Sequence, residues 1–272
     1  MCETCGCGNP EAGYKILKPG ENNRWSEVNT VHHDHPHDEH HHHHSHSHSH
    51  EEHSHTTHHK EISVETSVLY NNNLLAERNR GFLLAKNIKA YNLVSSPGSG
   101  KTTLLEKTIQ MVKKKEEVFV IEGDQQTSQD AMRIHATGAR VVQVNTGTAC
   151  HLDADMVHNA LRELEILNDS FLFIENVGNL VCPALFDLGE NKRILIVSVT
   201  EGEDKPLKYP YMFESSHLCI VNKIDLLPYV DFDLNKFREY AERINHHLEF
   251  IELSSKTEEN LEEWVKWLGK VR

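Results

Sequence analysis

The sequence Ser95-Ser96-Pro97-Gly98-Ser99-Gly100-Lys101-Thr102-Thr103 decides the fold that we expect for this chain. It follows an apolar run at 90–94 that is typical of a buried strand, and it opens a helix-like run at 102–115. A strand, a glycine-rich turn and a helix in this order are the context in which a Gly-Lys-Thr motif forms a phosphate-binding P-loop. We therefore expect an α/β domain with a mostly parallel central sheet flanked by helices.

The chemistry of this loop follows from its residue types. Gly98 and Gly100 can adopt positive φ, so that backbone amides and the helix N-terminus face a phosphate. Lys101 would reach the β- and γ-phosphates, and the Thr102 hydroxyl would bind Mg²⁺. The first glycine of the pattern is replaced by Ser95, which leaves the phosphate-contacting part intact. The expected phosphate contacts are Gly98, Ser99, Gly100, Lys101, Thr102 and Thr103.

A second motif indicates which base is bound. The strand-like run 218–221 is followed by Asn222-Lys223-Ile224-Asp225. A carboxylate at Asp225 can accept both N1–H and the 2-amino group of guanine, a donor pair that adenine lacks, so GTP is favoured over ATP. Lys223 would lie along the base, and Asn222 would tie this loop to the P-loop. After a further strand at 249–253, the residues Ser254, Ser255 and Lys256 resemble the last guanine-binding loop of GTPases.

Carboxylates follow two other predicted strands. Glu122 and Asp124 come after 118–121, where α/β sheets place ligands, and Asp124 could orient water or hold the Mg²⁺ shell. Glu122 is the weaker candidate. Glu175 and Gly178 end the strand 171–174 in a Glu-x-x-Gly that resembles the Asp-x-x-Gly of GTPases. Glu175 would hold Mg²⁺ through water, and the Gly178 amide would sense the γ-phosphate. The catalytic candidates are Lys101, Asp124 and Glu175.

Two cysteines and a histidine form a candidate metal site inside the domain. Cys150 and His151 open a predicted helix, where a thiolate would be favoured, and Cys182 lies in the predicted switch loop. If they converge, they give a Cys₂His set that is one ligand short of a closed tetrahedral site, which water or a second subunit could complete. The alternative is that both cysteines are ordinary buried residues, as we expect for Cys219.

The N-terminus holds three further thiols within seven residues. Cys2, Cys5 and Cys7, with the α-amine of Met1 as a possible fourth ligand, can wrap one metal ion. A mixed nitrogen and sulfur set suits Ni²⁺ in a planar geometry or Zn²⁺ in a tetrahedral one, and the spacing does not decide between them. A reactive terminus without a ligand role is the alternative.

A histidine-rich tract follows, with 16 of the 22 histidines between positions 32 and 59. So few apolar residues cannot form a core, and we expect disorder. Neutral imidazoles at this density make a store for Ni²⁺ and similar ions that weakens as pH falls through about 6.5. The alternatives are an engineered tag, which the internal and interrupted tract disfavours, or a merely solvated spacer.

Composition supports a division into residues 1–60, a disordered Cys/His-rich metal-binding segment, and 61–272, the GTPase domain. Helices are expected at 64–87 with a break at the asparagines 71–73. The net charge of −13 disfavours a nucleic-acid partner. Because no apolar run reaches membrane-spanning length and no secretory signal is visible, we expect no membrane association and a cytoplasmic location.

Taken together, the motifs resemble those of the hydrogenase nickel-incorporation GTPases, the HypB family, over essentially the full length. The resemblance rests on Cys2-x-x-Cys5-Gly-Cys7, the His-rich tract, the P-loop, Glu-Gly-Asp-Gln-Gln-Thr from 122, Cys150-His-Leu-Asp-Ala, and the segment from Ile174 to Pro183. It implies a SIMIBI-class P-loop fold and GTP-dependent homodimerisation. It also implies nickel delivery to the large subunit of [NiFe]-hydrogenase, with a small zinc-binding, HypA-like accessory protein as partner.

The resemblance further implies particular residue roles. Cys150, His151 and Cys182 become ligands for Ni²⁺ or Zn²⁺ at a dimer interface, and Asp124 a catalytic or Mg²⁺-linked carboxylate. The apolar residues Leu226, Leu227 and Val230 are candidates for dimer contacts, with ordinary packing as the alternative. Two other functions stay open: a urease nickel-insertion GTPase, and a nickel or zinc storage protein in which GTP only sets the oligomeric state. We expect slow GTP hydrolysis, because no residue resembles an arginine finger in cis.

Overall fold

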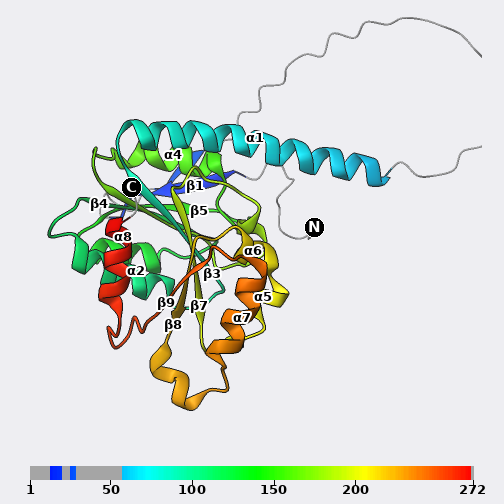
Figure 1. Ribbon diagram of the computed structural model, residues 1–272. Helices are drawn as coiled ribbons and strands as arrows, with labels where there is room; N and C mark the ends of the chain where they lie inside the picture. Colours follow the sequence, from blue (N-terminus) through cyan, green and yellow to red (C-terminus); the bar gives the residue numbers. More distant parts are fainter. Residues whose placement is uncertain (1–12, 20–24, 29–56, 271–272) are drawn as a thin grey trace, which may run out of the picture.

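The computed structural model describes residues 13–19, 25–28 and 57–270, which form a sheet with helices on both faces (Figure 1). The strands are β1 (Tyr14–Leu17), β2 (Trp25–Val28), β3 (Lys89–Ser95), β4 (Val118–Asp124), β5 (Arg140–Asn145), β6 (Phe171–Glu175), β7 (Lys192–Ser198), β8 (Leu218–Asn222) and β9 (Glu249–Glu252). The α-helices are α1 (Thr57–Ala85), α2 (Lys101–Val112), α3 (Gln129–Ala136), α4 (Ala154–Leu164), α5 (Lys205–Lys208), α6 (Pro210–Glu214), α7 (Leu234–Ile244) and α8 (Leu261–Lys270). Two 3₁₀ turns are η1 (Cys182–Ala184) and η2 (Ile224–Tyr229).

The strands lie in the order β2-β1-β5-β4-β6-β3-β7-β8-β9. All pairs from β5 to β9 are parallel, so their carboxyl ends meet at one edge, as predicted for a P-loop α/β domain. The central strands are apolar and buried throughout, which is the pattern of a parallel sheet covered on both faces.

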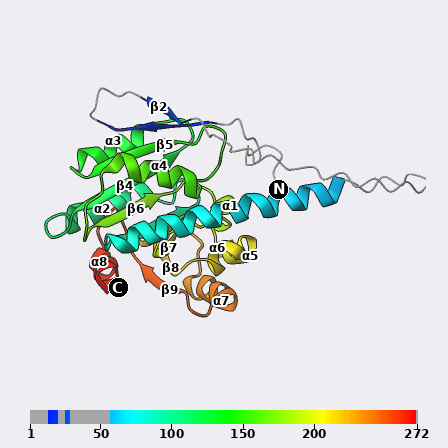
Figure 2. The ribbon, with the colours of Figure 1, turned by 90° about the horizontal axis from the view of Figure 1, so that it is seen from above.

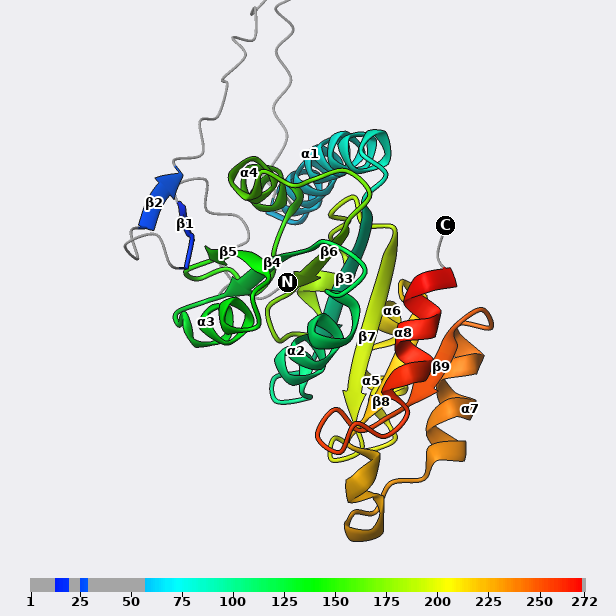
Figure 3. The same cartoon turned by 90° about the vertical axis from the view of Figure 1, so that its left-hand side faces the viewer.

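Alternate residues of these strands face two different helical layers. Tyr91, Leu93 and Ile194 share a core with α2, α3 and α8 on one face. Ala90 lies in the opposite core with α1 and α4, and Leu195 on that same face packs with α6 and α7. In Figure 3 the helices α1 and α4 lie on one side of the sheet and α2 on the other. The two layers hold the strand ends, and hence the site, on a rigid support.

Two strands that precede residue 60, the expected start of the domain, belong to the sheet beside β5. Strand β1 pairs antiparallel with β5 and in turn with β2, so that both extend the sheet (Figure 2). Tyr14, Ile16 and Leu17 are at most 3% exposed, and the Tyr14 hydroxyl donates to Oδ2 of Asp155 on α4 at 2.9 Å. This short apolar stretch has enough buried surface to order within a region whose average composition is polar. Residues 14–17 and 25–28 therefore belong structurally to the sheet.

Helix α1 is continuous across the asparagine run where we predicted a break, and it begins before residue 60. Buried Asn72 accepts the Ala154 amide at 2.9 Å and donates to the Asp187 carbonyl at 2.8 Å. Asn79 donates to the carbonyls of Ala154 and Leu188. These side chains join the helix to neighbouring loops instead of competing with its backbone. No described helix has the combination of length and apolar composition needed to cross a membrane.

Candidate functional site

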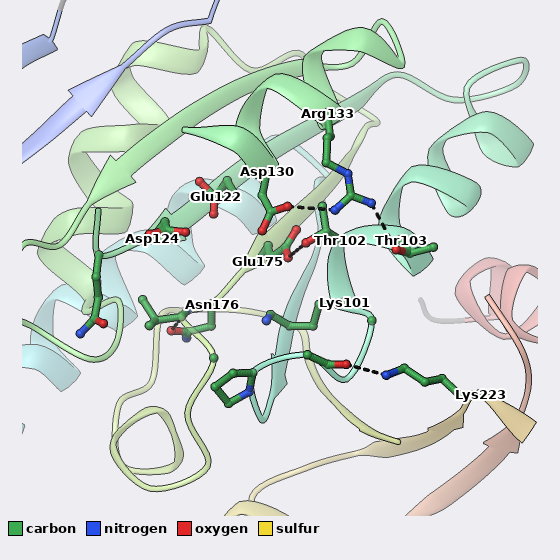
Figure 4. A pocket seen from close by; sticks show the side chains of 17 residues that line it. Lys101, Thr102, Thr103, Glu122, Asp124, Asp130, Arg133, Glu175, Asn176 and Lys223 are labelled. Atoms are coloured by element: carbon green, nitrogen blue, oxygen red, sulfur yellow. Dashed lines mark hydrogen bonds and ion pairs between the residues drawn. The ribbon is translucent and has the colours of Figure 1, made fainter. Parts of the chain in front are cut away.

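The loop between β3 and α2 borders a cavity of about 570 Å³ at the carboxyl edge of the sheet (Figure 4). Gly98 and Gly100 have φ of 75° and 98°, as the P-loop pattern requires. A Cβ at Gly100 would lie 2.5 Å from Nδ2 of Asn222, so this turn and the guanine loop touch. Ser95 ends β3 without positive φ, and a glycine is not needed there. Lys101 starts α2 at the cavity wall.

Buried carboxylates face the phosphate end of this cavity. The Thr102 hydroxyl donates to Oε1 of Glu175 at 2.6 Å, while Oε2 of Glu175 and Oε2 of Glu122 are buried without a hydrogen-bond partner among the described residues. Burial raises the pKa of Glu122, and the charges of Glu175 and Asp124 raise it further. Burial also raises the pKa of Glu175, although Lys101 and Thr102 oppose this. Unpaired carboxylate oxygens beside a hydroxyl fit a hard cation such as Mg²⁺.

Asp124 lies in this cavity wall but already has local partners. Its Oδ1 accepts the backbone amides of Gln126 at 2.8 Å and Thr127 at 3.1 Å, which closes the turn after β4. Ligand atoms of Glu122, Asp124 and Asp130 lie within 4.8 Å of one another. Asp130 therefore joins the carboxylates that the sequence had indicated.

The cavity also contains an arginine that the sequence analysis did not identify. Arg133 on α3 donates to Oδ1 of Asp130 at 3.0 Å, to Oε2 of Glu106 at 2.6 Å and to Oγ1 of Thr103 at 3.2 Å. Figure 4 shows the guanidinium between α3 and the P-loop helix. The i,i+3 spacing of Asp130 and Arg133 could have indicated a pair, but not that α3 places this pair in the cavity wall beside the P-loop.

The guanine loop is held against the P-loop by one buried side chain. Asn222 donates to the Ser99 carbonyl at 2.9 Å and accepts the Ser255 amide at 3.0 Å. Lys223 has φ of 64°, and its ammonium donates to the Gly98 carbonyl at 2.7 Å. The tying role predicted for Asn222 is thus present in the geometry.

Asp225, the carboxylate predicted to bind guanine, is oriented by the loop after β9. Ser254 Oγ donates to Oδ1 of Asp225 at 2.6 Å and also accepts the Thr257 amide at 3.1 Å. Lys256 is exposed at the rim of this loop. Both predicted guanine motifs therefore lie together although 29 residues separate Asp225 from Ser254.

The three residues of the predicted domain metal site converge. Cys150 Sγ lies 2.9 Å from Cys182 Sγ and 3.9 Å from Nδ1 of His151, and all three ligand atoms lie within 4.8 Å of one another. The ring of His151 packs on Phe186 with centroids 4.0 Å apart, which fixes its orientation. Both cysteines are free and half-buried, whereas Cys219 is fully buried in β8, as predicted for a core residue.

The Cys150 thiol does not have the lowered pKa that we expected for a cysteine at a helix N-terminus. Helix α4 begins at Ala154 with Asp153 as its N-cap, so Cys150 and His151 lie in the preceding loop. Burial and the hydrogen bond to Cys182 raise the pKa of Cys150 to about 12, so the metal-free thiol is not poised as a thiolate. Burial lowers the pKa of His151 to about 4, which leaves the imidazole neutral and able to ligate.

The loop after β6, which carries the Glu-x-x-Gly motif, connects the nucleotide cavity with the Cys150–His151–Cys182 cluster. A Cβ at Gly178 would lie 3.0 Å from Cα of Pro97, so the Glu-x-x-Gly loop rests on the P-loop. Four residues further on, Cys182 opens the turn η1. Asn179 between them donates to the Cys150 carbonyl at 3.4 Å.

Other predicted residues have a different status. Cys2, Cys5, Cys7 and the tract at 32–56 lie outside the described residues. Leu226, Leu227 and Val230 are half-buried and pack against the core of β7, β8 and α7, so ordinary packing accounts for part of their surface. Their role as dimer contacts stays a prediction.

The parallel sheet, the P-loop with its acidic neighbours and the guanine loop at the same edge define the class as a P-loop domain of the GTPase type. The sequence model of the family described as CobW/HypB/UreG, nucleotide-binding domain, matches residues 89–252. The chain belongs to this family, and among its members to the HypB hydrogenase maturation factors.

Relatives and solved structures support this placement. The hydrogenase maturation factor HypB of Escherichia coli strain K12 is 43% identical, in an alignment covering 100% of this chain and 99% of that protein. The crystal structure of HypB from Archaeoglobus fulgidus is 38% identical with a TM-score of 0.70 and covers 75% of this chain and 100% of that one. The structure of HypB from Helicobacter pylori in complex with nickel is also 38% identical with a TM-score of 0.70, covering 74% and 94%.

Proposed function

We propose that this protein hydrolyses GTP to time the delivery of nickel to the large subunit of [NiFe]-hydrogenase, in the cytoplasm. The observation that carries the proposal is the position of Cys182. Cys182 lies on the same loop as Gly178, which lines the nucleotide cavity. Its thiol lies beside the ligand atoms of Cys150 and His151. A change in this loop with nucleotide state would change the metal site directly.

Nucleotide binding uses residues that surround the cavity. The Lys101 ammonium and the P-loop amides hold the phosphates, and Asp225 accepts the two guanine donors, as its contact with Ser254 orients it to do. Magnesium, when bound by Thr102 and Glu175, would neutralise charge on the β- and γ-phosphates. The unpaired Oε2 of Glu175 supports this assignment.

Hydrolysis requires a water that is aligned with the γ-phosphate. Asp124 is the side chain we assign to orient that water, with Glu122 behind it. Arg133 lines the cavity, but Asp130 and Glu106 neutralise its guanidinium. Because no described arginine is free to stabilise the transition state in cis, turnover is slow and suited to timing rather than to flux.

The cluster is chemically suited to carry nickel as cargo. Two thiols and a neutral imidazole form a soft donor set for Ni²⁺, and Zn²⁺ would compete for it. Three ligands leave one position for water or for a second subunit, which accommodates the expected homodimer. A position that is not filled by the chain itself also lets a HypA-like partner take the ion.

The N-terminal cysteines and the histidine tract would act earlier in the same process. Cys2, Cys5 and Cys7 would bind one ion tightly, and the tract would buffer nickel nearby. Strand β1 begins at the carboxyl end of β5, where Lys15 pairs with Asn145. The start of β1 therefore lies at the edge of the sheet that carries the cluster.

The test measures nickel bound to the cluster in two nucleotide states. Cys2, Cys5 and Cys7 are replaced by serine, so that the thiolate-to-nickel absorption band reports Cys150 and Cys182, since the histidine tract gives no such band. Affinity is measured with GDP and with a non-hydrolysable GTP analogue, and GTP turnover is followed separately. A nucleotide-dependent affinity and measurable turnover support the proposal. A storage protein would show neither, and that result would refute the proposal.

A further inference from the structure

Asn176 directly follows Glu175 in the Glu-x-x-Gly motif. Its side chain is 1% exposed, and the residue borders the nucleotide cavity. Its backbone amide continues the sheet by donating to the Leu93 carbonyl at 3.0 Å. Figure 4 shows the side chain beside the P-loop, in the cavity wall. The proposed chemistry of nucleotide binding does not use this amide group.

The Asn176 side chain reaches the metal loop directly. Its Oδ1 accepts the backbone amide of Leu152 at 3.1 Å and that of Val177 at 3.0 Å. Leu152 follows His151 and is fully buried, and it packs so closely on Gly123 of β4 that a Cβ there would lie 2.7 Å away. One carbonyl oxygen therefore ties the switch motif to the residue next to a cluster ligand.

The amide nitrogen of Asn176 begins a hydrogen-bond network that leads to the segment after Cys182. Asn176 Nδ2 donates to Oδ1 of Asn92 at 3.3 Å, and Asn92 Nδ2 donates to Oε1 of Glu190 at 3.0 Å. Glu190 pairs with Arg193 at 3.1 Å, and all four side chains are at most 8% exposed. Buried polar groups of this kind are costly to leave without a hydrogen-bond partner.

Arg193 completes the connection. Its guanidinium donates to the carbonyls of Ala184 at 3.0 Å and Phe186 at 2.7 Å. Ala184 ends the turn that Cys182 begins, and the Phe186 ring packs on His151. The network thus supports both halves of the cluster.

We propose that Asn176 is the positioning residue through which nucleotide state sets the geometry of the Cys150–His151–Cys182 cluster, with Asn92, Glu190 and Arg193 as its fixed support. The inference rests on the proposed nucleotide-timed delivery of nickel. When the γ-phosphate shifts the Glu-x-x-Gly loop, Asn176 must either carry the Leu152 amide with it or lose that bond. Since both groups are buried, moving together is favoured, and the spacing of the ligands changes.

The test compares nickel affinity with GDP and with a non-hydrolysable GTP analogue in the full chain carrying serine at positions 2, 5 and 7. We expect the two affinities to differ by a factor on the order of 5 to 150, the usual range of coupling between sites. Asn176→Ala should bring this ratio close to one. The thiolate-to-nickel band, whose position differs between the two states, should become the same in both. A general loss of affinity in the variant cancels in the ratio.

Two further variants make the result decisive. Asn176→Ser keeps a polar group in the wall but is too short to reach Leu152, so it should lose the coupling as well and serves if the alanine variant unfolds. Asn79→Ala is the matched control, because Asn79 is a buried asparagine that holds Ala154 and Leu188 without bordering the cavity. It should keep the ratio.

Three other results would contradict the inference or the proposed function. An unchanged ratio in the folded Asn176 variants overturns the role of this residue while leaving nucleotide-timed delivery intact. Loss of the ratio in Asn79→Ala as well would mean that packing in general carries the coupling. A ratio of one before any of these changes would refute both the inference and the gating in the proposed function.

Discussion

Cys150 and Cys182 lie 32 residues apart in the chain, yet their sulfur atoms are 2.9 Å apart at the carboxyl edge of the sheet. Cys150 comes from the loop after β5, and Cys182 from the loop after β6. The strand β4 separates these two strands in the sheet, so the loops must cross its end to meet. The end of β4 also lines the nucleotide cavity, so the cysteine cluster lies beside that cavity.

Replacing Cys182 should remove nickel binding by the cluster. In Cys182→Ser, with serine also at positions 2, 5 and 7, one of two thiolates is lost and affinity should fall at least about a hundredfold. The thiolate-to-nickel band measures it. Cys219→Ala is the control, because that thiol is buried in β8 away from the cluster. Full nickel affinity in the Cys182 variant would exclude it as a ligand.

The affinity of the cluster for nickel should rise with pH between about 7 and 9. Burial and Cys182 raise the pKa of Cys150 to about 12, so nickel must displace its proton, and each released proton makes log affinity rise by about one per pH unit. His151, with its pKa lowered to about 4 by burial, is neutral throughout and adds nothing. Titrations by the thiolate band check this. Nickel binding by histidine side chains, whose ordinary pKa is near 6.5, should not change with pH in this range. A cluster affinity that does not change with pH would contradict the prediction.

Lys101→Ala should abolish most GTP hydrolysis, because the ammonium stabilises charge on the transferred phosphate. We expect a loss of at least about a hundredfold in turnover, measured by phosphate release. Nickel bound by the tract and the cluster without nucleotide should stay nearly the same. Lys107→Ala serves as the control, since Lys107 is on the same helix but pairs with Glu258 at the surface. Normal turnover without Lys101 would refute the P-loop assignment.

Asp225→Asn should exchange the base preference. An amide presents a donor where guanine requires an acceptor, so GTP affinity should fall roughly 10- to 100-fold, as expected for a hydrogen bond to a charged group. Xanthosine triphosphate, which carries a carbonyl oxygen in place of the 2-amino group, should bind better than before. Competition binding with both nucleotides measures this. Ser254→Ala should weaken both nucleotides alike, because it only releases the Asp225 carboxylate. Unchanged discrimination in the asparagine variant would count against the motif.

Deleting residues 1–60 should destabilise the domain. The deletion removes β1, β2 and the first four residues of α1. It exposes the backbone of β5 and loses the burial of Tyr14, Ile16 and Leu17, on the order of 5 kcal/mol in total. Replacing 32–55 by a Gly/Ser linker of equal length should leave stability unchanged, since β1 and β2 remain. Denaturant unfolding of both variants checks this. Equal stability of the full deletion and the linker variant would show that β1 contributes little.

The guanine and phosphate sites could be predicted because each is a local motif. Gly98, Gly100 and Lys101 lie in one turn whose backbone conformation depends on those residues, and Asn222 to Asp225 follow directly after a buried strand. Parallel strands then place both loops at one edge, so the order of strand and helix patterns is sufficient to infer the fold. The metal cluster could be stated only as a hypothesis, because spacing does not show whether Cys182 reaches Cys150.

Other features depended on contacts that no local pattern encodes. The asparagines at 71–73 indicate a helix break by composition, yet Asn72 is satisfied by the Ala154 and Asp187 backbones, so α1 continues. Helix α3 brings Arg133 to Thr103 across 30 residues. The apparent helix start at Cys150 is shifted to Ala154 by the Asp153 cap, which leaves the thiol half-buried in a loop with a raised pKa.

The amino-acid sequence by itself determined the P-loop, the guanine motif, the carboxylates after β4 and β6, and the residue types available to a metal, because these follow from local conformation and side-chain chemistry. Only the tertiary structure decided that Cys150, His151 and Cys182 meet, that β1 pairs with β5 and extends the sheet, and that Asn176 links nucleotide and metal loops. The physical reason is that these contacts join segments far apart in the chain, and only the packing of both helical layers on one sheet selects which partners each buried polar group finds.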